Sequence, residues 1–365
     1  MNAAIDPTNN PAARVSRTPW QLFWDRLRRR HLALTGGVIL LFLYAVTLLA
    51  GFVSPYQFDR EDRERFFHPP IRPVFKGFRL VVPRFQSIEG QIAKYERVPE
   101  QSRPLQFFVK GEKYKLAGLI PCRTHLLGTG DAQFPIYLLG TDQLGRDVFS
   151  RLLYGSQISL SIGLVGILLT FSMGMLVGGI SGYFGGWTDS IIMRLCELIM
   201  SVPGLYLILT LRSVFPPGLS STYVYLLIVV ILSFIGWASM ARVIRGMTLS
   251  LRERQFVLAA RVLGQTRLKI IAFHILPNTF SYVIVAATLS VPYYILGEVI
   301  LSYLAVGIQE PQASWGLMLK DAYVNRQNLT LYPWLLAPGA AIFVTVLAFN
   351  FLGDGLRDAA DTKSN

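Results

Sequence analysis

The sequence of 365 residues is 52% hydrophobic and 16% charged, and its formal net charge is +13. A soluble domain usually carries about a quarter charged residues, so this composition argues against an ordinary soluble protein and favours several membrane spans. The positive charge does not indicate nucleic acid as a partner, because the arginines flank apolar segments, as cytoplasmic juxtamembrane residues do. The two cysteines and four histidines lack the spacing of a disulfide framework or a metal site, so we expect neither a metal nor another cofactor.

The N-terminal segment, residues 1–31, ends in an amphipathic stretch. Its apolar residues are Trp20, Phe23, Trp24 and Leu27. Their helical spacing, with arginines beside them, favours a helix lying in the membrane interface over a few isolated aromatic belt residues. Residues 32–53 carry no charge and are long enough to cross a hydrocarbon core about 30 Å thick. Because 31 residues precede them, we expect an uncleaved first span rather than a signal peptide.

Residues 54–157 differ in composition from the rest of the chain. They hold prolines, charges and aromatics, with no apolar run long enough to span a membrane. Residues 104–110 and 113–120 are predicted to form a hairpin that turns at Gly111-Glu112. Residues 78–85 would add a strand, which Pro83 restricts to a sheet edge. The sequence therefore predicts a small, mixed or β-rich insertion outside the membrane, together with a segment that leads into the second span.

Five further spans are expected, at 158–182, 195–211, 223–241, 279–301 and 334–353. Six spans place both termini on one side of the membrane. The arginines before the first span and those in the loop 242–278 fall on that side, which the positive-inside rule makes cytoplasmic. We therefore expect an all-α polytopic membrane protein with a five-helix core, residues 158–355, and a cytoplasmic tail, residues 356–365.

Three glycines share one face of the second span: Gly174, Gly178 and Gly182. Lipid tails give helices no hydrophobic reason to associate, so small residues supply close packing instead. We expect this face to contact another helix, in this chain or in a partner. The alternative is that glycine is simply common in membrane helices.

Ionisable residues inside a span are functional candidates, because a charge in lipid is costly. Glu298 lies late in the fifth span and is the candidate for a pathway or gating role, with an interfacial position as the alternative. Arg194 and Glu197 are expected to pair locally. The chain has no phosphate-binding GxxxxGK[ST] loop and no nucleophile–base arrangement. We therefore expect no enzymatic activity, and energy must come from a partner.

The cytoplasmic loop 242–278 carries the most informative motif. A short helix is predicted to end at Gly264, and Pro277 suits the first turn of the fifth span. The residues expected on one side of the helix are Phe256, Ala259, Ala260 and Leu263, with Arg261 among the arginines around them. Such a helix is suited to docking in a groove of another protein.

The AAxxxG motif that begins at Ala259, followed by HILPN up to residue 278, resembles the loop by which ABC importer permeases dock on their ATP-binding subunits. Ala259, Ala260, Gly264, Leu276 and Pro277 fit that pattern. Leu258 occupies the usual glutamate position, so no role of that glutamate is carried over. Docking is thus expected of these five residues together with Phe256 and Arg261.

Four further stretches resemble the C-type permease subunit of dipeptide and oligopeptide importers: 139–160, 182–189, 298–319 and 345–363. The resemblance implies the six-helix fold of these permeases, a place in the bacterial inner membrane and transport of peptides. It also implies partners: a second, homologous permease, two ABC ATPase subunits and an extracytoplasmic solute-binding protein. Members of the family also carry metal chelates, oligosaccharides or peptide antibiotics, and the insertion at about 55–137 is longer than in most members.

Two other classes of function compete with this one. A secondary transporter or channel, not driven by ATP, would show inverted repeats and ionisable midplane sites, and no convincing repeat is present. A membrane-anchored binding or signalling protein would use residues 54–157, which leaves the motif around Gly264 without a role.

Overall fold

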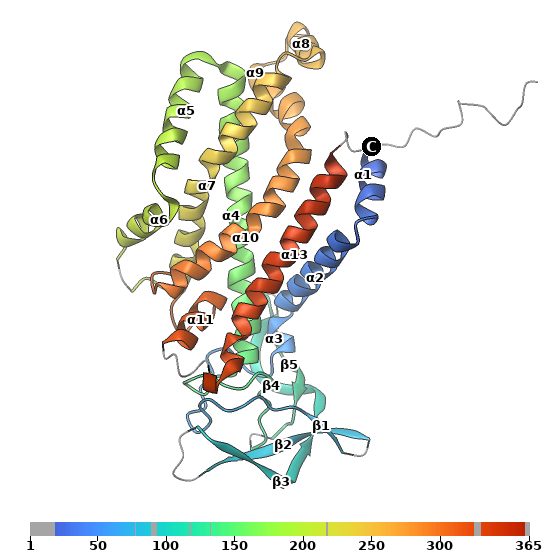
Figure 1. Ribbon diagram of the computed structural model, residues 1–365, viewed down its shortest axis with the longest axis vertical. Helices are drawn as coiled ribbons and strands as arrows, with labels where there is room; N and C mark the ends of the chain where they lie inside the picture. The colour runs from blue at the N-terminus through green and yellow to red at the C-terminus, as the bar shows by residue number, and fades with distance from the viewer. Residues whose placement is uncertain are drawn as a thin grey trace, which may run out of the picture.

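A computed structural model describes residues 19–361, except 77, 89–92, 117, 132, 217 and 325–329. The start of the N-terminal segment and the last four residues of the tail lie outside the described residues. The chain forms a bundle of long helices with a small β region at one end (Figure 1).

Five segments of the described chain are helical, long and apolar enough to cross a membrane: His31–Leu48, Val148–Phe184, Ser221–Leu251, Arg267–Tyr303 and Pro333–Ala360. The first three are α2 (His31–Leu48), α4 (Val148–Phe184) and α7 (Ser221–Leu251). The fourth consists of α9 (Arg267–Ile270), a π-helical turn (Ile271–Ile275), a 3₁₀ turn (Leu276–Thr279) and α10 (Phe280–Tyr303). The fifth joins a 3₁₀ turn (Pro333–Leu336) to α13 (Ala337–Ala360). The structure thus confirms a polytopic helical protein.

The third predicted span is not one helix. α4 and α7 run parallel, because Gly174 lies against Met240 and Gly182 lies against Thr248. The chain between them must therefore return along the bundle, and α5 (Gly186–Ser201) and α6 (Gly204–Ser213) make this return (Figure 1). The helix breaks at Val202, whose backbone is extended, because the following Pro203 disfavours the α conformation in the residue before it.

The other helices surround α4 and α7. α10 packs on α4 and α13, and α2 packs on α13 (Figure 1). α1 (Pro19–Arg28) lies at the end of this group, where Leu27 is buried with Ala33 and Ala359. Arg26 Nη1 also donates a hydrogen bond of 2.7 Å to the carbonyl of Asp361. The segment before the first span is therefore a helix, held against the end of α13.

The insertion is β-rich, as expected, but two details of the prediction are wrong. β1 (Val74–Lys76), β2 (Arg79–Ser87) and β3 (Tyr95–Pro104) form an antiparallel sheet in the order β1-β2-β3. β2 is therefore central rather than an edge. It tolerates Pro83 because the register shifts between Pro83 and Arg84, and an interrupted ladder spares the missing N–H.

The second sheet pairs β4 (Gln106–Leu116) with β5 (Ile120–Gly128). The predicted turn at Gly111-Glu112 is wrong, since β4 continues through these residues at an irregularity in the ladder. The chain turns instead between Leu116 and Ile120, where Gly118 has a positive φ of 75°. This left-handed conformation favours glycine.

Candidate functional site

The loop 242–278, which the sequence predicts to be cytoplasmic, contains the short helix α8 (Gln255–Val262), and this helix stops sharply. Gly264 adopts a φ of 75°. The amide of Gln265 donates to the carbonyl of Ala260 at 3.2 Å, and the amide of Gly264 donates to that of Arg261 at 3.0 Å. This is the glycine-stopped helix end that satisfies the last free carbonyls. Because the end is fixed, α8 presents its faces in one orientation.

The two faces of α8 differ in burial. Val257 and Ala260 point inward and pack among buried residues such as Ile270 and Ile271. The outer apolar residues are Phe256, Leu258, Ala259, Val262 and Leu263, all exposed; these five are called the outer face of α8 below. Ala260 was predicted to share a side with Phe256, and the structure contradicts this, because Ala260 follows the inward-facing Val257 by three residues, close to one helical turn.

The remaining residues of the motif divide in the same way. Leu276 is buried in the same core as Ala260, whereas Pro277 is exposed. Arg261 is exposed, and its guanidinium lies 5.7 Å from the ring centre of Tyr183. Arg267 lies in the same way over Phe184, at 5.6 Å. The structure thus brings α8, α9 and the end of α4 together.

Ionic contacts fasten this region to the bundle. Arg245 of α7 binds Asp189 of α5 through two hydrogen bonds, of 2.6 and 2.5 Å. Ser181 of α4 donates to the same carboxylate at 2.6 Å. Arg252, just after α7, donates to the carbonyl of Gly182 at 3.2 Å. Three helices therefore meet at one carboxylate next to the loop.

The face formed by Gly174, Gly178 and Gly182 lies directly on α7. A Cβ atom on Gly178 would stand 2.4 Å from the carbonyl oxygen of Ala241. On Gly182 it would stand 2.7 Å from the carbonyl oxygen of Arg245. The backbones of α4 and α7 are thus in contact, as small residues permit, and this contact runs as far as the loop.

A hollow of about 460 Å³ opens between α4, the α5–α6 break, α7 and α10. The hydroxyl-bearing residues that line it are Thr170, Ser239, Tyr282, Ser290, Tyr293 and Tyr294. None of the described residues lining the hollow is charged. The extended backbone at Val202 forms part of the wall, consistent with irregular backbone at membrane depth being tolerated where it lines a cavity.

Glu298 is placed elsewhere, within packed protein. Its side chain is fully buried, and it accepts hydrogen bonds from Ser159 Oγ at 2.9 Å and Ser302 Oγ at 2.7 Å. Ser159 Oγ in turn accepts from the amide of Trp315, at the start of α11 (Trp315–Tyr323), at 3.2 Å. The carboxylate thus joins α4, α10 and α11.

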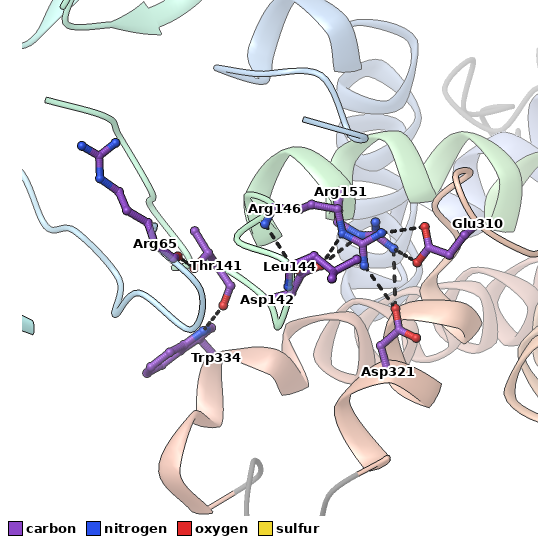
Figure 2. A network of polar contacts seen from close by, with 9 residues as sticks. All are labelled: Arg65, Thr141, Asp142, Leu144, Arg146, Arg151, Glu310, Asp321 and Trp334. Carbon is purple, nitrogen blue, oxygen red and sulfur yellow. Dashed lines mark hydrogen bonds and ion pairs between the residues drawn. The ribbon is translucent and has the colours of Figure 1, made fainter. Parts of the chain in front are cut away.

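A second ionic cluster lies at the start of α4 and was not predicted from the sequence (Figure 2). Arg146 Nε donates to Asp142 at 2.7 Å and Arg146 Nη1 to Glu310 at 2.6 Å, while Arg151 Nη2 donates to Glu310 at 3.2 Å. Asp321 of α11 lies 3.6 Å from Arg146 and 3.7 Å from Arg151. Only Glu310 is substantially exposed; both arginine side chains are at most 4% exposed.

The cluster shapes the acidity of its members. Burial raises the pKa of Asp321 to about 6, against the opposing pull of Arg151 and Arg146. For Glu310 burial also acts to raise the pKa, but the two arginines outweigh it, and the pKa is lowered. Asp142 and Arg146 are four residues apart, which is a local signal. Nothing local in the sequence pairs them with Glu310 or Asp321.

Neighbouring contacts hold the segment before α4 in place. Trp334 Nε1 donates to the carbonyl of Thr141 at 3.0 Å, and Thr141 Oγ1 donates to the carbonyl of Arg65 at 2.5 Å (Figure 2).

The side-chain arrangement offers no place for a metal among the described residues, where no group of three or more His, Cys, Asp or Glu is suitably placed.

Comparison with known proteins gives a consistent result. Residues 174–364 match the family described as the inner membrane component of binding-protein-dependent transport systems, and residues 18–70 match the N-terminal transmembrane domain of oligopeptide transport permease C. A dipeptide transport system permease protein of Bacillus subtilis is 33% identical over 363 residues, covering 99% of this chain and 90% of the relative.

Two further relatives are similar. An oligopeptide transport system permease protein of Bacillus subtilis is 40% identical over 241 residues, which are 66% of this chain and 76% of the relative. A glutathione transport system permease protein of Pectobacterium atrosepticum is 32% identical over 348 residues, which are 95% of this chain and 92% of the relative.

Proposed function

This chain belongs to the family of inner membrane components of binding-protein-dependent transport systems, and on that premise we propose that it imports peptides by coupling to ATPase subunits through α8. It is a permease subunit of an ABC importer and not an enzyme. Two partner ATPase subunits would then hydrolyse ATP.

The observation that carries the coupling proposal is the outer face of α8. Val262 is 86% exposed and Leu263 is 79% exposed, although the other face of the same short helix is buried. An apolar helix face gains free energy by entering a groove on a partner. The arginines beside it, Arg254 and Arg261, favour a groove with an acidic rim.

The contact between α4 and α7 gives the docked helix a mechanical route into the membrane. Arg252, just after α7, binds the carbonyl of Gly182, and Asp189 joins α4, α5 and α7 beside it. The glycine face brings the backbones of α4 and α7 into contact at Gly178 and Gly182. Closure of the ATPase subunits would move α8 and, with it, these helices as one body. Glu298, at the joint of α4, α10 and α11, would contribute to gating if that joint opens.

The hollow beside the α5–α6 break is proposed as this chain's half of the translocation pathway. A second, homologous permease would supply the other half. The relatives named above transport dipeptides, oligopeptides and glutathione, which supports a peptide substrate. An uncharged wall of hydroxyls and aromatic rings can bind the backbone amides and apolar side chains of a peptide. It would not favour peptides with charged side chains. An extracytoplasmic solute-binding protein would then provide the selection.

The orientation follows from the arginines. α8 and α9 lie at one end of the bundle, and α1 and the end of α13 lie toward the same end (Figure 1). Because the loop between α7 and α10 is rich in arginine, the positive-inside rule makes this end cytoplasmic. We thus propose a multi-pass protein of the bacterial inner membrane whose N- and C-termini are both cytoplasmic.

The test compares one substitution at two sites. Val262→Asp places a charge on the outer face of α8. Val214→Asp makes the same change beyond α6, at the opposite end of the bundle, where the valine is 75% exposed. Affinity purification from the native membrane, followed by mass spectrometry, should recover the second permease with both variants and the ATPase subunits only with Val214→Asp. Uptake should be lost only with Val262→Asp.

Two results would oppose the proposal. Retention of the ATPase subunits and full uptake by Val262→Asp would remove α8 from coupling. Recovery of the wild-type chain alone, with uptake that continues without ATP, would favour a secondary transporter or channel.

A further inference from the structure

The turn of the β4–β5 hairpin combines exposed apolar side chains with basic ones. Leu119 is 82% exposed and Ile120 is 58% exposed. Lys113 and Lys115 before the turn and Arg123 after it are also exposed. Burying two large apolar side chains of this kind away from water is favourable, so this turn is a candidate for contact with an apolar phase.

The hairpin is fastened to the end of the first span. α3 (Ala50–Val53) continues from α2 after Leu49. His125 Nδ1 lies 2.6 Å from the carbonyl oxygen of Ser54, and a Cβ on Gly51 would stand 2.3 Å from the ring of Tyr114. The rings of Phe108 and Phe52 are 6.1 Å apart. The hairpin therefore lies directly on α3.

The contacts of His125 with Ser54 and of Tyr114 with Gly51 also give the hairpin a direction. From Ser54 to Gly51 the chain runs back toward α2 and the membrane. From His125 to Tyr114, which is paired with Cys122, the hairpin runs toward its turn. The two directions coincide, so the turn points back along the first span. Tyr114 OH donates to the carbonyl of Thr124 at 2.7 Å, and Thr124 lies farther from the turn than Cys122, the partner of Tyr114. The Tyr114 ring therefore leans away from the turn. The strand extends further toward the membrane than this ring does.

The reach of the hairpin places the turn at the edge of the bilayer. The turn begins two residues beyond Tyr114, which adds roughly 7 Å along a strand. The same distance along a helix corresponds to about five residues, so the turn lies near the level of Thr47 in α2. Thr47 contacts Ser156 of α4 at 2.8 Å, just before the apolar stretch of that helix. β1, β2 and β3 lie farther from the bundle (Figure 1).

We propose that the β4–β5 turn inserts Leu119 and Ile120 into the outer leaflet of the membrane and that Lys113, Lys115 and Arg123 contact lipid phosphates. Apolar side chains flanked by long cationic ones suit this interface, because lysine and arginine keep their charges at the headgroups while their stems lie along apolar groups. The insertion is thereby anchored at two points, the end of the first span and the bilayer itself. The proposal requires that the chain spans the membrane, and its assignment to the outer leaflet rests on the orientation proposed above; it is independent of the coupling through α8.

The test uses the full chain in lipid nanodiscs. Leu119→Cys, in a Cys122→Ser background, is labelled with an environment-sensitive fluorophore; Cys196 is fully buried. Ile120→Cys is a second site, and Phe78→Cys, beside the start of β2 and fully exposed, is the matched control. A nitroxide on lipid headgroups should quench the probe at positions 119 and 120 more than a water-soluble nitroxide does, with emission shifted to shorter wavelengths. The control should show the reverse.

Equal quenching by the water-soluble nitroxide at positions 119 and 78 would overturn the proposal. So would a shift of emission at position 119 that appears only when the solute-binding protein is added, since the turn would then be a surface for that protein.

Discussion

Replacing Gly178 by alanine tests whether backbone contact between α4 and α7 holds the bundle together. The new Cβ would stand 2.4 Å from the carbonyl oxygen of Ala241 and 3.0 Å from Cβ of Ile244, whereas ordinary contact begins at 3.4 Å. The first contact falls short by 3.4 − 2.4 = 1.0 Å. Because that atom belongs to the backbone of a helix, it cannot rotate away, and the helices must separate by about this amount.

Overpacking of this kind costs about 1–3 kcal/mol. Alanine also forms helices better than glycine by about 0.5–1 kcal/mol, which partly offsets the cost. Gly246→Ala, in α7, provides the control, since no atom lies within 4 Å of its added Cβ. The gain in helix propensity is common to both variants, so the difference between them isolates the packing cost of about 1–3 kcal/mol.

The measurement is the free energy of unfolding of each purified variant in detergent, from chemical denaturation followed by fluorescence. Gly178→Ala should be less stable than wild type, and Gly246→Ala should be as stable or slightly more stable. Equal stability of the two variants would refute the reasoning, because the α4–α7 contact would then adapt freely.

Three more predictions use the same unfolding assay. Arg151→Met leaves Arg146 as the one cation of the cluster facing Asp142, Glu310 and Asp321, and the loss of this buried partner should cost about 3–5 kcal/mol. Arg194→Met, which removes an exposed pair with Glu197, should cost at most about 1 kcal/mol, and similar losses would contradict this. The pKa of Asp321 is raised from 3.8 to about 6, so the folded chain holds this proton more tightly than the unfolded chain. The free energy of unfolding should therefore fall as the pH rises from 3.8 to about 6, and the contribution of Asp321 should be constant above that pH. Asp321→Asn should remove this part of the pH profile, and unchanged profiles would argue against the shift. Glu298→Leu should be about 1–3 kcal/mol less stable than Glu298→Gln, because it leaves two serine hydroxyls without their acceptor, and equal values would contradict the hydrogen bonds.

Hydropathy located five membrane helices of the described chain, because each must bury a long apolar stretch in lipid, but it also predicted a span at 195–211 where the structure has two shorter helices. Helix ends were less predictable. α4 begins at Val148 rather than near residue 158 because Asp147 accepts a hydrogen bond from the amide of Ser150 and caps the helix, so the helix extends beyond the apolar window. The break at Val202 was signalled by Pro203, but the apolar residues on both sides suggested one continuous helix.

Contacts between distant residues explain what the sequence did not reveal. The spacing of Gly174, Gly178 and Gly182 indicated a packing face but not that α7 covers it. The inward orientation of Ala260 depends on the residues that α8 packs against. Glu298 attracted attention as a charge in a span, yet its two hydroxyl partners are Ser159 of α4 and Ser302 of its own helix. Such partners carry no signal in the local sequence.

The ionic cluster at the start of α4 has a consequence for how the protein is made. Arg146 and Arg151 bind Glu310, which follows them by 164 and 159 residues in the chain. A ribosome therefore releases α4 long before Glu310 and Asp321, and until then Asp142 is the one acid of the cluster that is present for the two arginines. The cluster at the start of α4 can close only after Glu310 and Asp321 have emerged, so the C-terminal part of the chain completes a site that the first half began.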